Sequence, residues 1–258
     1  MLNGEIIKGI IMGIVQGITE FFPVSSTAHL ILFPWFFGWK GEIDTLAFDV
    51  ALHGGTLLSL LVCFHRDILN ILIKDRRTLF MVVIACIPAG VAGILLHHAA
   101  ESALRSPVII VGTLIGVGAL MLAAEFYGKR ERKEASLLDS VFIGVSQAAA
   151  LVPGVSRSGI TITAGLFRNL TREYAARFTF IISIPVIAGA TALEGRKLLA
   201  HPESYHLDVF VAGLAAAFIS GVFAIKFLLA FLRKYPLNLF VYYRFLLAAV
   251  ILTLLYVR

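Results

Sequence analysis

Two short stretches of this sequence place carboxylate, amide, hydroxyl and guanidinium side chains inside otherwise apolar segments. In the first stretch, Gln16 and Glu20 are four residues apart, so a helix would present both on one face. A carboxylate in apolar surroundings must be paired, protonated or bound to a cation. Gln16 and Glu20 therefore predict a metal site for a hard divalent cation with oxygen ligands, Mg²⁺ in the first place and Ca²⁺ as the alternative. The competing interpretation is that Glu20 is only the structural partner of an arginine.

The first stretch is interrupted at Pro23 and continues with hydroxyl residues and a histidine, namely Ser25, Ser26, Thr27 and His29. Ser26 and His29 are three residues apart at the start of the helix expected after the break. This spacing lets an imidazole take the proton of a serine hydroxyl, so the pair is a candidate nucleophile and base. A lone histidine near a helix start is more often a hydrogen-bonded structural group, and this alternative stays open for His29.

The second stretch, residues 153–161, offers glycines, hydroxyls and one guanidinium. Gly154 and Gly159 allow the backbone to approach a ligand closely. The planar guanidinium of Arg157 suits a bidentate grip on phosphate oxygens. A carboxylate-bound cation, a hydroxyl beside a base and an arginine are the groups that phosphoryl transfer needs, because its barrier falls through positioning and charge stabilisation. The alternative is that Arg157 only neutralises Glu20.

The two stretches belong to an internal repeat, because residues 13–27 and 144–158 run in register, 131 residues apart. Each copy is apolar but broken midway, which suits a re-entrant hairpin of two short helices with a turn buried in protein. We expect hairpins at residues 5–37 and 138–168, with proline kinks in ordinary helices as the alternative. The helix after each break would direct free backbone N–H groups and roughly half a positive charge toward the turn, where an anion can bind.

Composition places the chain in a membrane. Of its 258 residues 59% are hydrophobic and only 15% are charged, and the mean hydropathy of +0.91 is too high for a water-soluble domain of this length. The net charge of +6 does not indicate nucleic-acid binding, because the basic residues lie in short loops between apolar segments. Cys63 and Cys86 lie in apolar runs without metal-ligand spacing and are interpreted as packing residues.

Six apolar runs are long enough for spanning helices, at residues 46–64, 78–97, 107–125, 178–195, 208–231 and 238–257. The expected fold is therefore an all-α integral membrane domain with six transmembrane helices and two re-entrant helical hairpins. Residues 1–130 and 131–258 each hold one hairpin and three spanning helices. Because three is odd, the second half must enter the membrane upside down, as in an inverted-topology repeat.

Loop charges predict the orientation of this domain. The loops on one side carry 13 lysines and arginines and the loops on the other side carry 6, so the richer side is expected to be cytoplasmic. The first hairpin then opens outward and the second inward, and their tips meet inside the membrane.

Glycines spaced four residues apart let helices pack closely in lipid. We assign this role to Gly9, Gly13 and Gly17 and to Gly112 and Gly116.

Three further residues stand out in apolar sequence. His53 shares a helical face with Asp49, and we favour a hydrogen-bonded structural pair over a place in the cavity. Lys226 and Arg244 are expected to extend toward an interface or to pair locally.

The chain resembles the undecaprenyl pyrophosphate phosphatase family of bacterial membranes, which is associated with bacitracin resistance. One family motif is Glu or Gln, three residues, then Glu, which matches Gln16 and Glu20; another is Pro-Gly-X-Ser-Arg-Ser with a following Thr, which matches residues 153–158 and Thr161. Residues 21–29 also look like the family sequence that follows its Glu. The likeness covers essentially the full chain, through length, segment count and repeat.

The resemblance implies a phosphatase that hydrolyses undecaprenyl diphosphate to undecaprenyl phosphate and inorganic phosphate, which recycles the lipid carrier of peptidoglycan synthesis. It implies that Glu20 and Gln16 bind the cation and that Ser26 is the nucleophile, with His29 near it. Whether Ser26, His29 or an activated water attacks phosphorus stays open. The substrate-binding candidates are Ser25, Thr27, Gly154, Ser156, Arg157, Ser158 and Thr161. Many family members carry Glu where this chain has Gln16, so a second anionic metal ligand is missing here.

The resemblance also implies a bacterial inner-membrane protein that releases phosphate on the periplasmic side, with a polyprenyl diphosphate lipid and the bilayer as its partners. A homodimer is compatible with the sequence, and a nucleic-acid partner is not expected. The competing hypothesis is a transporter or flippase of a polyprenyl phosphate or another anion, because inverted repeats with sites near the bilayer midplane are usual in secondary carriers.

Overall fold

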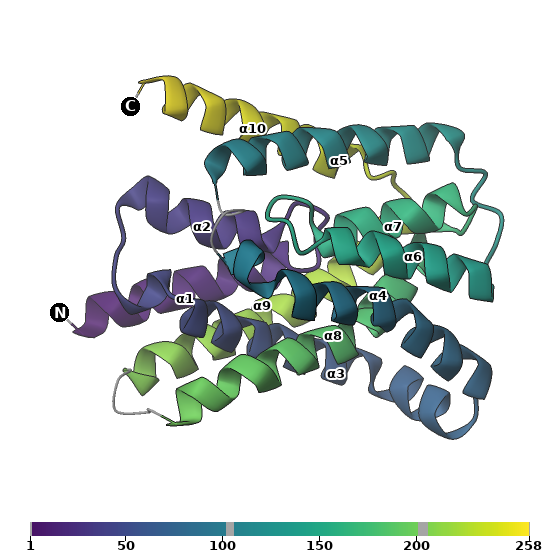
Figure 1. Ribbon diagram of the computed structural model, residues 1–258, viewed down its shortest axis with the longest axis horizontal. Helices are drawn as coiled ribbons and strands as arrows, with labels where there is room; N and C mark the ends of the chain where they lie inside the picture. The colour runs from purple at the N-terminus through teal and green to yellow at the C-terminus, as the bar shows by residue number, and fades with distance from the viewer. Residues whose placement is uncertain (1, 102–105, 201–205, 258) are drawn as a thin grey trace.

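The structure, a computed structural model, describes residues 2–101, 106–200 and 206–257. Throughout these residues the regular elements are helices, and the backbone contributes a single isolated bridge, between Arg132 and Leu170. The elements are α1 (Leu2–Thr19), α2 (Ser26–Phe37), the 3-10 turn η1 (Glu42–Asp44), α3 (Leu46–Ile73), α4 (Arg76–Glu101), α5 (Pro107–Tyr127), α6 (Leu137–Ala149), α7 (Arg157–Phe167), α8 (Arg172–Ala200), α9 (Leu207–Leu232) and α10 (Asn238–Val257) (Figure 1).

Six helices of the described chain, α3, α4, α5, α8, α9 and α10, are long and apolar enough to cross a membrane. The predicted all-α, multi-pass membrane fold is therefore confirmed. Several helices are longer than the apolar runs from which they were predicted. In α3, for example, charged residues such as Arg66 and Asp67 continue the helix beyond its apolar part. Large apolar side chains such as Phe126 and Phe223 are exposed, as expected on surfaces that face lipid.

The remaining helices are shorter and carry the predicted site. Helices α2, α6 and α7 have 12, 13 and 11 residues, well under the roughly 20 that span a bilayer. Helix α1 has 18 residues and ends four residues before Pro23, where the break was expected. In Figure 1 the chain turns back between α1 and α2 and between α6 and α7, and the two hairpins approach the middle of the molecule from opposite ends.

Close backbone packing brings α1 against α9 and α6 against α4. A Cβ atom on Gly13 would lie 2.2 Å from the carbonyl oxygen of Gly213, and one on Gly144 would lie 2.7 Å from that of Ala85. Only glycine allows backbones to approach this closely, so the packing role predicted for the glycines of α1 is confirmed.

The same prediction is wrong for α5. A Cβ atom on Gly112 or Gly116 would meet no atom of the described chain within 4 Å, and both glycines are exposed. A four-residue glycine spacing shows which residues share a face, but it does not show which way the face is turned. On α5 the buried face is the one that contains Leu114 and Gly118.

Aromatic packing holds the turn after α1 in place. Phe21 packs edge to face on Phe180 of α8, with ring centroids 5.4 Å apart, and Phe22 packs on Phe240 of α10 at 5.3 Å. Because each ring buries a large apolar area, these contacts fix the turn between two spanning helices. The turn that carries the candidate chemistry is therefore anchored from both sides.

Candidate active site

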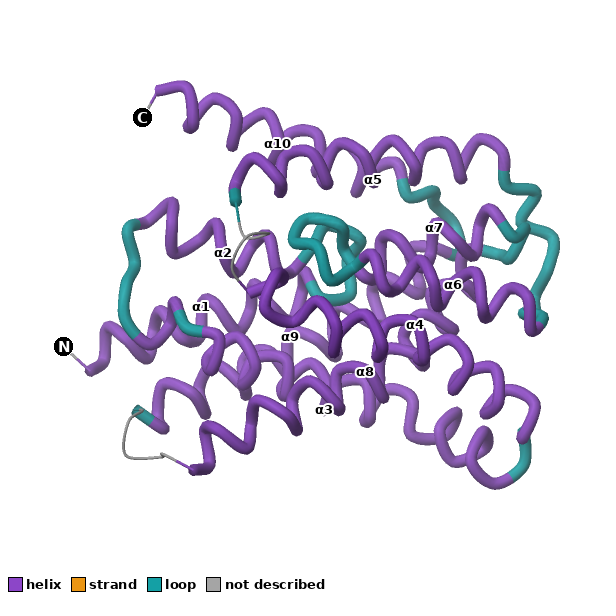
Figure 2. Tube along the Cα trace, in the orientation of Figure 1, coloured by secondary structure: helices purple, strands orange, loops and turns teal. Residues whose placement is uncertain are grey.

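The two interrupted stretches meet. The turns that join α1 to α2 and α6 to α7 lie together in the middle of the molecule (Figure 2). The backbone N–H of Gly154 donates to Ser25 Oγ at 3.2 Å, and Ser158 Oγ donates to the carbonyl oxygen of Phe22 at 3.1 Å. Residues more than a hundred positions apart thus form one contiguous tip region, as the repeat predicted.

Each turn ends in a serine that caps the next helix. Ser25 has φ 75° and Ser156 has φ 72°, a backbone region that L residues rarely occupy. Their side chains accept from the N–H groups of Ala28 at 3.4 Å and Gly159 at 3.1 Å. Strained backbone of this kind is concentrated at functional sites. The matching caps make Ser26 the first residue of α2 and Arg157 the first residue of α7.

Gly154 is required by its surroundings. Its φ of 89° disfavours any side chain, and a Cβ atom would lie 2.0 Å from Thr113 Oγ1. The carbonyl of Pro153 accepts from the same hydroxyl at 2.8 Å. Gly154 therefore shapes the second turn against α5.

Glu20 is the centre of the site. It follows α1 directly, is 7% exposed, and has partners from three other elements. Its carboxylate accepts from Gln16 Nε2 at 3.1 Å, from Ser26 Oγ at 2.6 Å and from Arg157 Nη2, and it lies 3.6 Å from His53 Nε2. The predicted constellation of carboxylate, hydroxyl and guanidinium is therefore assembled. The contact with Arg157 is also the one that the structural-partner interpretation requires, and a phosphate would compete for it.

A cavity of about 170 Å³, which we call the tip pocket, opens beside this cluster. It is lined by Glu20, Ser25, Ser26, Thr27, His53, Ala89, Gln147, Ala150, Leu151, Ser156, Arg157, Val186, Ile187 and Ala190. Its polar side is the tip region and its apolar side comes from α4 and α8. The volume is enough for several water molecules or a small anion. The free N–H ends of α2 and α7 and the charge of Arg157 favour an anion there.

His29 does not approach the Ser26 hydroxyl as the spacing suggested. Its Nδ1 donates to the carbonyl oxygen of Ser25 at 2.7 Å, which leaves Nε2 to accept from Tyr243 Oη at 2.6 Å. The ring is 3% exposed and is absent from the tip pocket. Both nitrogens are occupied, so this geometry fits the structural alternative. The group bonded to the Ser26 hydroxyl is Glu20.

Three substrate-binding candidates, Gly154, Ser158 and Thr161, lie outside the lining of the tip pocket. Ser158 bonds across to the first turn, and Thr161 Oγ1 donates to the Arg157 carbonyl at 2.7 Å and accepts from Thr179 Oγ1 at 2.9 Å. The hydroxyls of Ser158 and Thr161 therefore hold the first turn of α7, and through it the guanidinium that faces Glu20.

Arg244 is the main residue that the sequence analysis missed. It is fully buried, so of the two expected alternatives it follows local pairing and not extension to an interface. Its guanidinium donates to four carbonyl oxygens, those of Pro23, Thr113, Leu114 and Gly154. One side chain of α10 thereby joins both turns to α5. Hydropathy cannot reveal this role, because the carbonyls that need a donor become apparent only once the turns are built.

His53 was also interpreted differently. Its Nδ1 bonds the backbone carbonyl of Asp49 at 2.7 Å, and its ring lines the tip pocket beside Glu20. The bond to the Asp49 backbone fits the structural pair that we favoured. The place in the cavity, the alternative, is observed as well, and the carboxylate beside the ring there belongs to the turn after α1. Sequence periodicity carries no information about such a contact.

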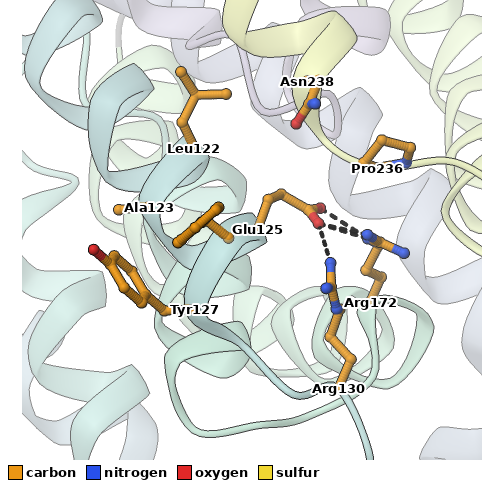
Figure 3. Close-up of a pocket in the computed structure, with 9 residues that line it drawn as sticks. Leu122, Ala123, Glu125, Tyr127, Arg130, Arg172, Pro236 and Asn238 are labelled. Atoms are coloured by element: carbon orange, nitrogen blue, oxygen red, sulfur yellow. Dashed lines mark hydrogen bonds and ion pairs between the residues drawn. The ribbon is translucent and has the colours of Figure 1, made fainter.

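A second cavity, of about 540 Å³, lies at the end of α5, and its lining residues include no Ser, Thr, Cys or His. Glu125 there accepts from Arg130 at 2.6 Å and from Arg172 Nε at 2.8 Å, as Figure 3 shows, and from the N–H of Leu237 at 2.9 Å. These contacts join α5, the start of α8 and the loop before α10. Both oxygens of the Glu125 carboxylate are used by these partners, so we interpret Glu125 as a structural anchor.

Comparison with known proteins gives a consistent picture. The family model of bacitracin resistance protein BacA matches residues 9–250. The chain is similar to proteins named undecaprenyl-diphosphatase from Thermodesulfovibrio yellowstonii (56% identity over 98% of this chain and 99% of the relative), Moorella thermoacetica (43%, over 98% and 99%) and Rubrobacter xylanophilus (42%, over 97% and 98%). With residues of both motifs in contact through Glu20 and Arg157, and with nearly its full length matched, the chain belongs to the bacitracin resistance protein BacA family.

Proposed function

We propose that this protein is a membrane phosphatase that hydrolyses undecaprenyl diphosphate to undecaprenyl phosphate and inorganic phosphate. The observation that carries the proposal is the Glu20 carboxylate, which contacts the Ser26 hydroxyl on one side and the Arg157 guanidinium on the other. The names of the relatives supply the substrate. The product would be the lipid carrier used in peptidoglycan synthesis, and its recycling accounts for bacitracin resistance.

The geometry supports attack by Ser26. Its hydroxyl already donates to Glu20 Oε2 at 2.6 Å, so the carboxylate can take the proton as the oxygen attacks the terminal phosphorus. The bridging P–O bond breaks, undecaprenyl phosphate leaves, and the phosphoryl group remains on Ser26. Glu20 first passes this proton to the departing undecaprenyl phosphate. As a carboxylate again, it would then deprotonate a water molecule, whose attack breaks the bond between Ser26 and the phosphoryl group and releases inorganic phosphate. Direct attack by such a water on the substrate is the alternative route.

Arg157 and the two helix ends would stabilise the transferred group. A diphosphate that enters the tip pocket competes with Glu20 for Arg157, which can grip two phosphate oxygens at once. The N–H groups at the start of α2 and α7 direct partial positive charge to the same place. This arrangement favours the charge that spreads over the phosphoryl oxygens in the transition state.

The residues fit a divalent cation, which we propose as a cofactor. Gln16 is fully buried, its Nε2 bonds Glu20, and its Oε1 has no partner among the described residues. An unpaired buried oxygen beside a carboxylate matches the donor set of Mg²⁺ or Ca²⁺. Glu20 and Gln16 would hold the ion, which would neutralise charge on the diphosphate.

We further propose that the halves 1–130 and 131–258 form an inverted repeat in the bacterial inner membrane, with the two hairpins re-entrant. Exchange of the halves converts the α1–α9 contact into the α6–α4 contact, and both are extensive in the structure. The loop charges favour a cytoplasmic position for the loops that follow α3, α5, α7 and α9. The tip pocket would then receive substrate from the periplasmic side.

The test is phosphate release by the full chain in detergent, from a polyprenyl diphosphate with Mg²⁺ or with EDTA. Glu20→Gln should lower kcat by about 10²–10⁴-fold, because the base and the cation ligand are both lost. Ser26→Ala should be at least as severe if serine attacks, whereas a loss under tenfold would assign the attack to water. Ser146→Ala is the matched control, since among the described residues its hydroxyl bonds only the carbonyl of Ile143. Absence of phosphate release from the wild type, or full release by both site variants, would refute the proposal and favour a carrier.

A further inference from the structure

The internal repeat pairs Gln16 with a second glutamine, Gln147, that the proposed mechanism does not use. Three residues before each lies a glycine packed on the backbone of a spanning helix, Gly13 on α9 and Gly144 on α4. Each glutamine therefore leaves its helix next to a tight helix contact and close to the tip region. Gln16 is 0% and Gln147 is 2% exposed.

The Gln147 amide has a defined orientation. Its Nε2 donates to the carbonyl oxygen of Ala85 at 3.2 Å. The reverse orientation would set two oxygens against each other, so the amide oxygen must be on the other side. There it is buried and without a partner among the described residues, as is Oε1 of Gln16. A buried acceptor without a donor is unfavourable. Gln147 lines the tip pocket and Gln16 bonds Glu20 of that pocket, so their unpaired oxygens indicate a ligand that supplies positive charge.

Gln147 lines the tip pocket together with Glu20 and Arg157. Within the described residues no group of three or more His, Cys, Asp or Glu side chains could hold a metal ion. A cation in this pocket would have Glu20 as its carboxylate and would depend on neutral oxygens for its other protein ligands. Hard divalent cations accept amide oxygens readily.

We propose that Gln147 would supply an amide oxygen to the divalent cation at Glu20, in addition to the one from Gln16. This inference rests on the proposed function, because the bound diphosphate would provide the remaining ligands. Each repeat then contributes one glutamine to a site shared between them. Since only one protein ligand is charged, the ion binds weakly on its own and tightly with the diphosphate.

The test uses Mn²⁺ as the probe and methylenediphosphonate as a non-hydrolysable diphosphate, with free Mn²⁺ measured by electron paramagnetic resonance on the full chain in detergent. Gln147→Met should weaken Mn²⁺ binding about tenfold, because it keeps the side-chain shape and removes the oxygen. Gln147→Glu should tighten it by a similar factor, because a charged oxygen replaces a neutral one. Ser146→Ala should bind as the wild type does.

A purely structural Gln147, needed only for its bond to Ala85, predicts that the Met and Glu variants, which both lose this bond, have the same Mn²⁺ affinity and bind no more tightly than the wild type. That result, or the absence of Mn²⁺ binding by a folded wild type that hydrolyses substrate, would overturn the inference and leave the proposed function intact. The predicted order of affinities in a protein that releases no phosphate would support the cation site and refute the phosphatase. Thermal unfolding with and without Mn²⁺ reports that each variant is folded.

Discussion

The buried guanidinium of Arg244 gives the most demanding prediction. Replacing Arg244 by Met removes four hydrogen bonds to carbonyl oxygens, two of which belong to the turns that carry Ser25 and Ser156. A hydrogen bond from a charged donor contributes about 1.5–3 kcal/mol. Against this loss, methionine avoids the burial of a cation, which costs several kcal/mol. We therefore expect a net destabilisation of about 3–5 kcal/mol.

Catalysis should suffer as well, because the two turns lose the link that sets their separation. A displacement of roughly 1 Å between Ser26 and the phosphate-binding groups can cost about 10² in rate. Thermal unfolding in detergent should show a midpoint lowered by about 10 °C, and phosphate release should fall about 10²-fold. Arg244→Lys keeps the charge but not the planar guanidinium, so its unfolding midpoint and its rate should lie between those of the wild type and of Arg244→Met.

The control for this experiment is Lys226→Met, a cation in an apolar helix whose side chain is exposed. Its midpoint and rate should stay near those of the wild type, since surface substitutions change stability by about 0.5 kcal/mol or less. If Arg244→Met unfolds within about 2 °C of the wild type and keeps its rate, the four-carbonyl link does not hold the turns and the reasoning is wrong.

Three further predictions concern other contacts. Gly13→Leu should prevent close packing of α1 on α9 and destabilise the fold severely, whereas Gly112→Leu, on an open face, should leave the unfolding midpoint unchanged. Tyr243→Phe should lower the free energy of unfolding by about 1–3 kcal/mol, because it removes the hydrogen-bond donor to His29. The rate of phosphate release should stay within a few-fold of the wild-type rate. A large loss of rate would instead indicate that His29 acts as a catalytic base. The hydrogen bond to Glu42 raises the pKa of His206, so its stabilisation is complete below the unfolded pKa and is lost as pH rises through the folded one. His206→Gln should make the thermal unfolding midpoint less dependent on pH over that range. An unchanged pH dependence would show that the His206–Glu42 pair does not contribute to stability.

The sequence was most informative where a single physical requirement decides the structure. Spanning helices follow from uninterrupted apolar runs, and all six were predicted. Glu20, Ser26 and Arg157 were identifiable because a polar group in apolar sequence needs a partner, and the repeat indicated that the partners would be each other.

The features that the sequence did not predict depend on the rotation of each helix about its own axis and on the hydrogen-bond donors that the turn carbonyls need. The exposed face of Gly112 and the contact of His53 with Glu20 both follow from helix rotation, which a periodic pattern does not determine. Arg244 satisfies turn carbonyls whose orientation exists only in the folded chain. The spacing of Ser26 and His29 predicted a hydrogen-bonded pair. In the structure the His29 imidazole bonds the backbone carbonyl of Ser25 and does not bond the Ser26 hydroxyl.

The equivalent positions of Ser26 and Arg157, each the first residue of a capped helix, have a consequence for stoichiometry. Two copies of the N-terminal half would bring together two carboxylates and two hydroxyls with no guanidinium, and two copies of the C-terminal half would oppose two guanidinium groups without an acid. Neither pair of identical halves would have the groups that phosphoryl transfer needs. Covalent linkage of the halves guarantees one of each in every molecule, so a split version should regain turnover only when both fragments are present together.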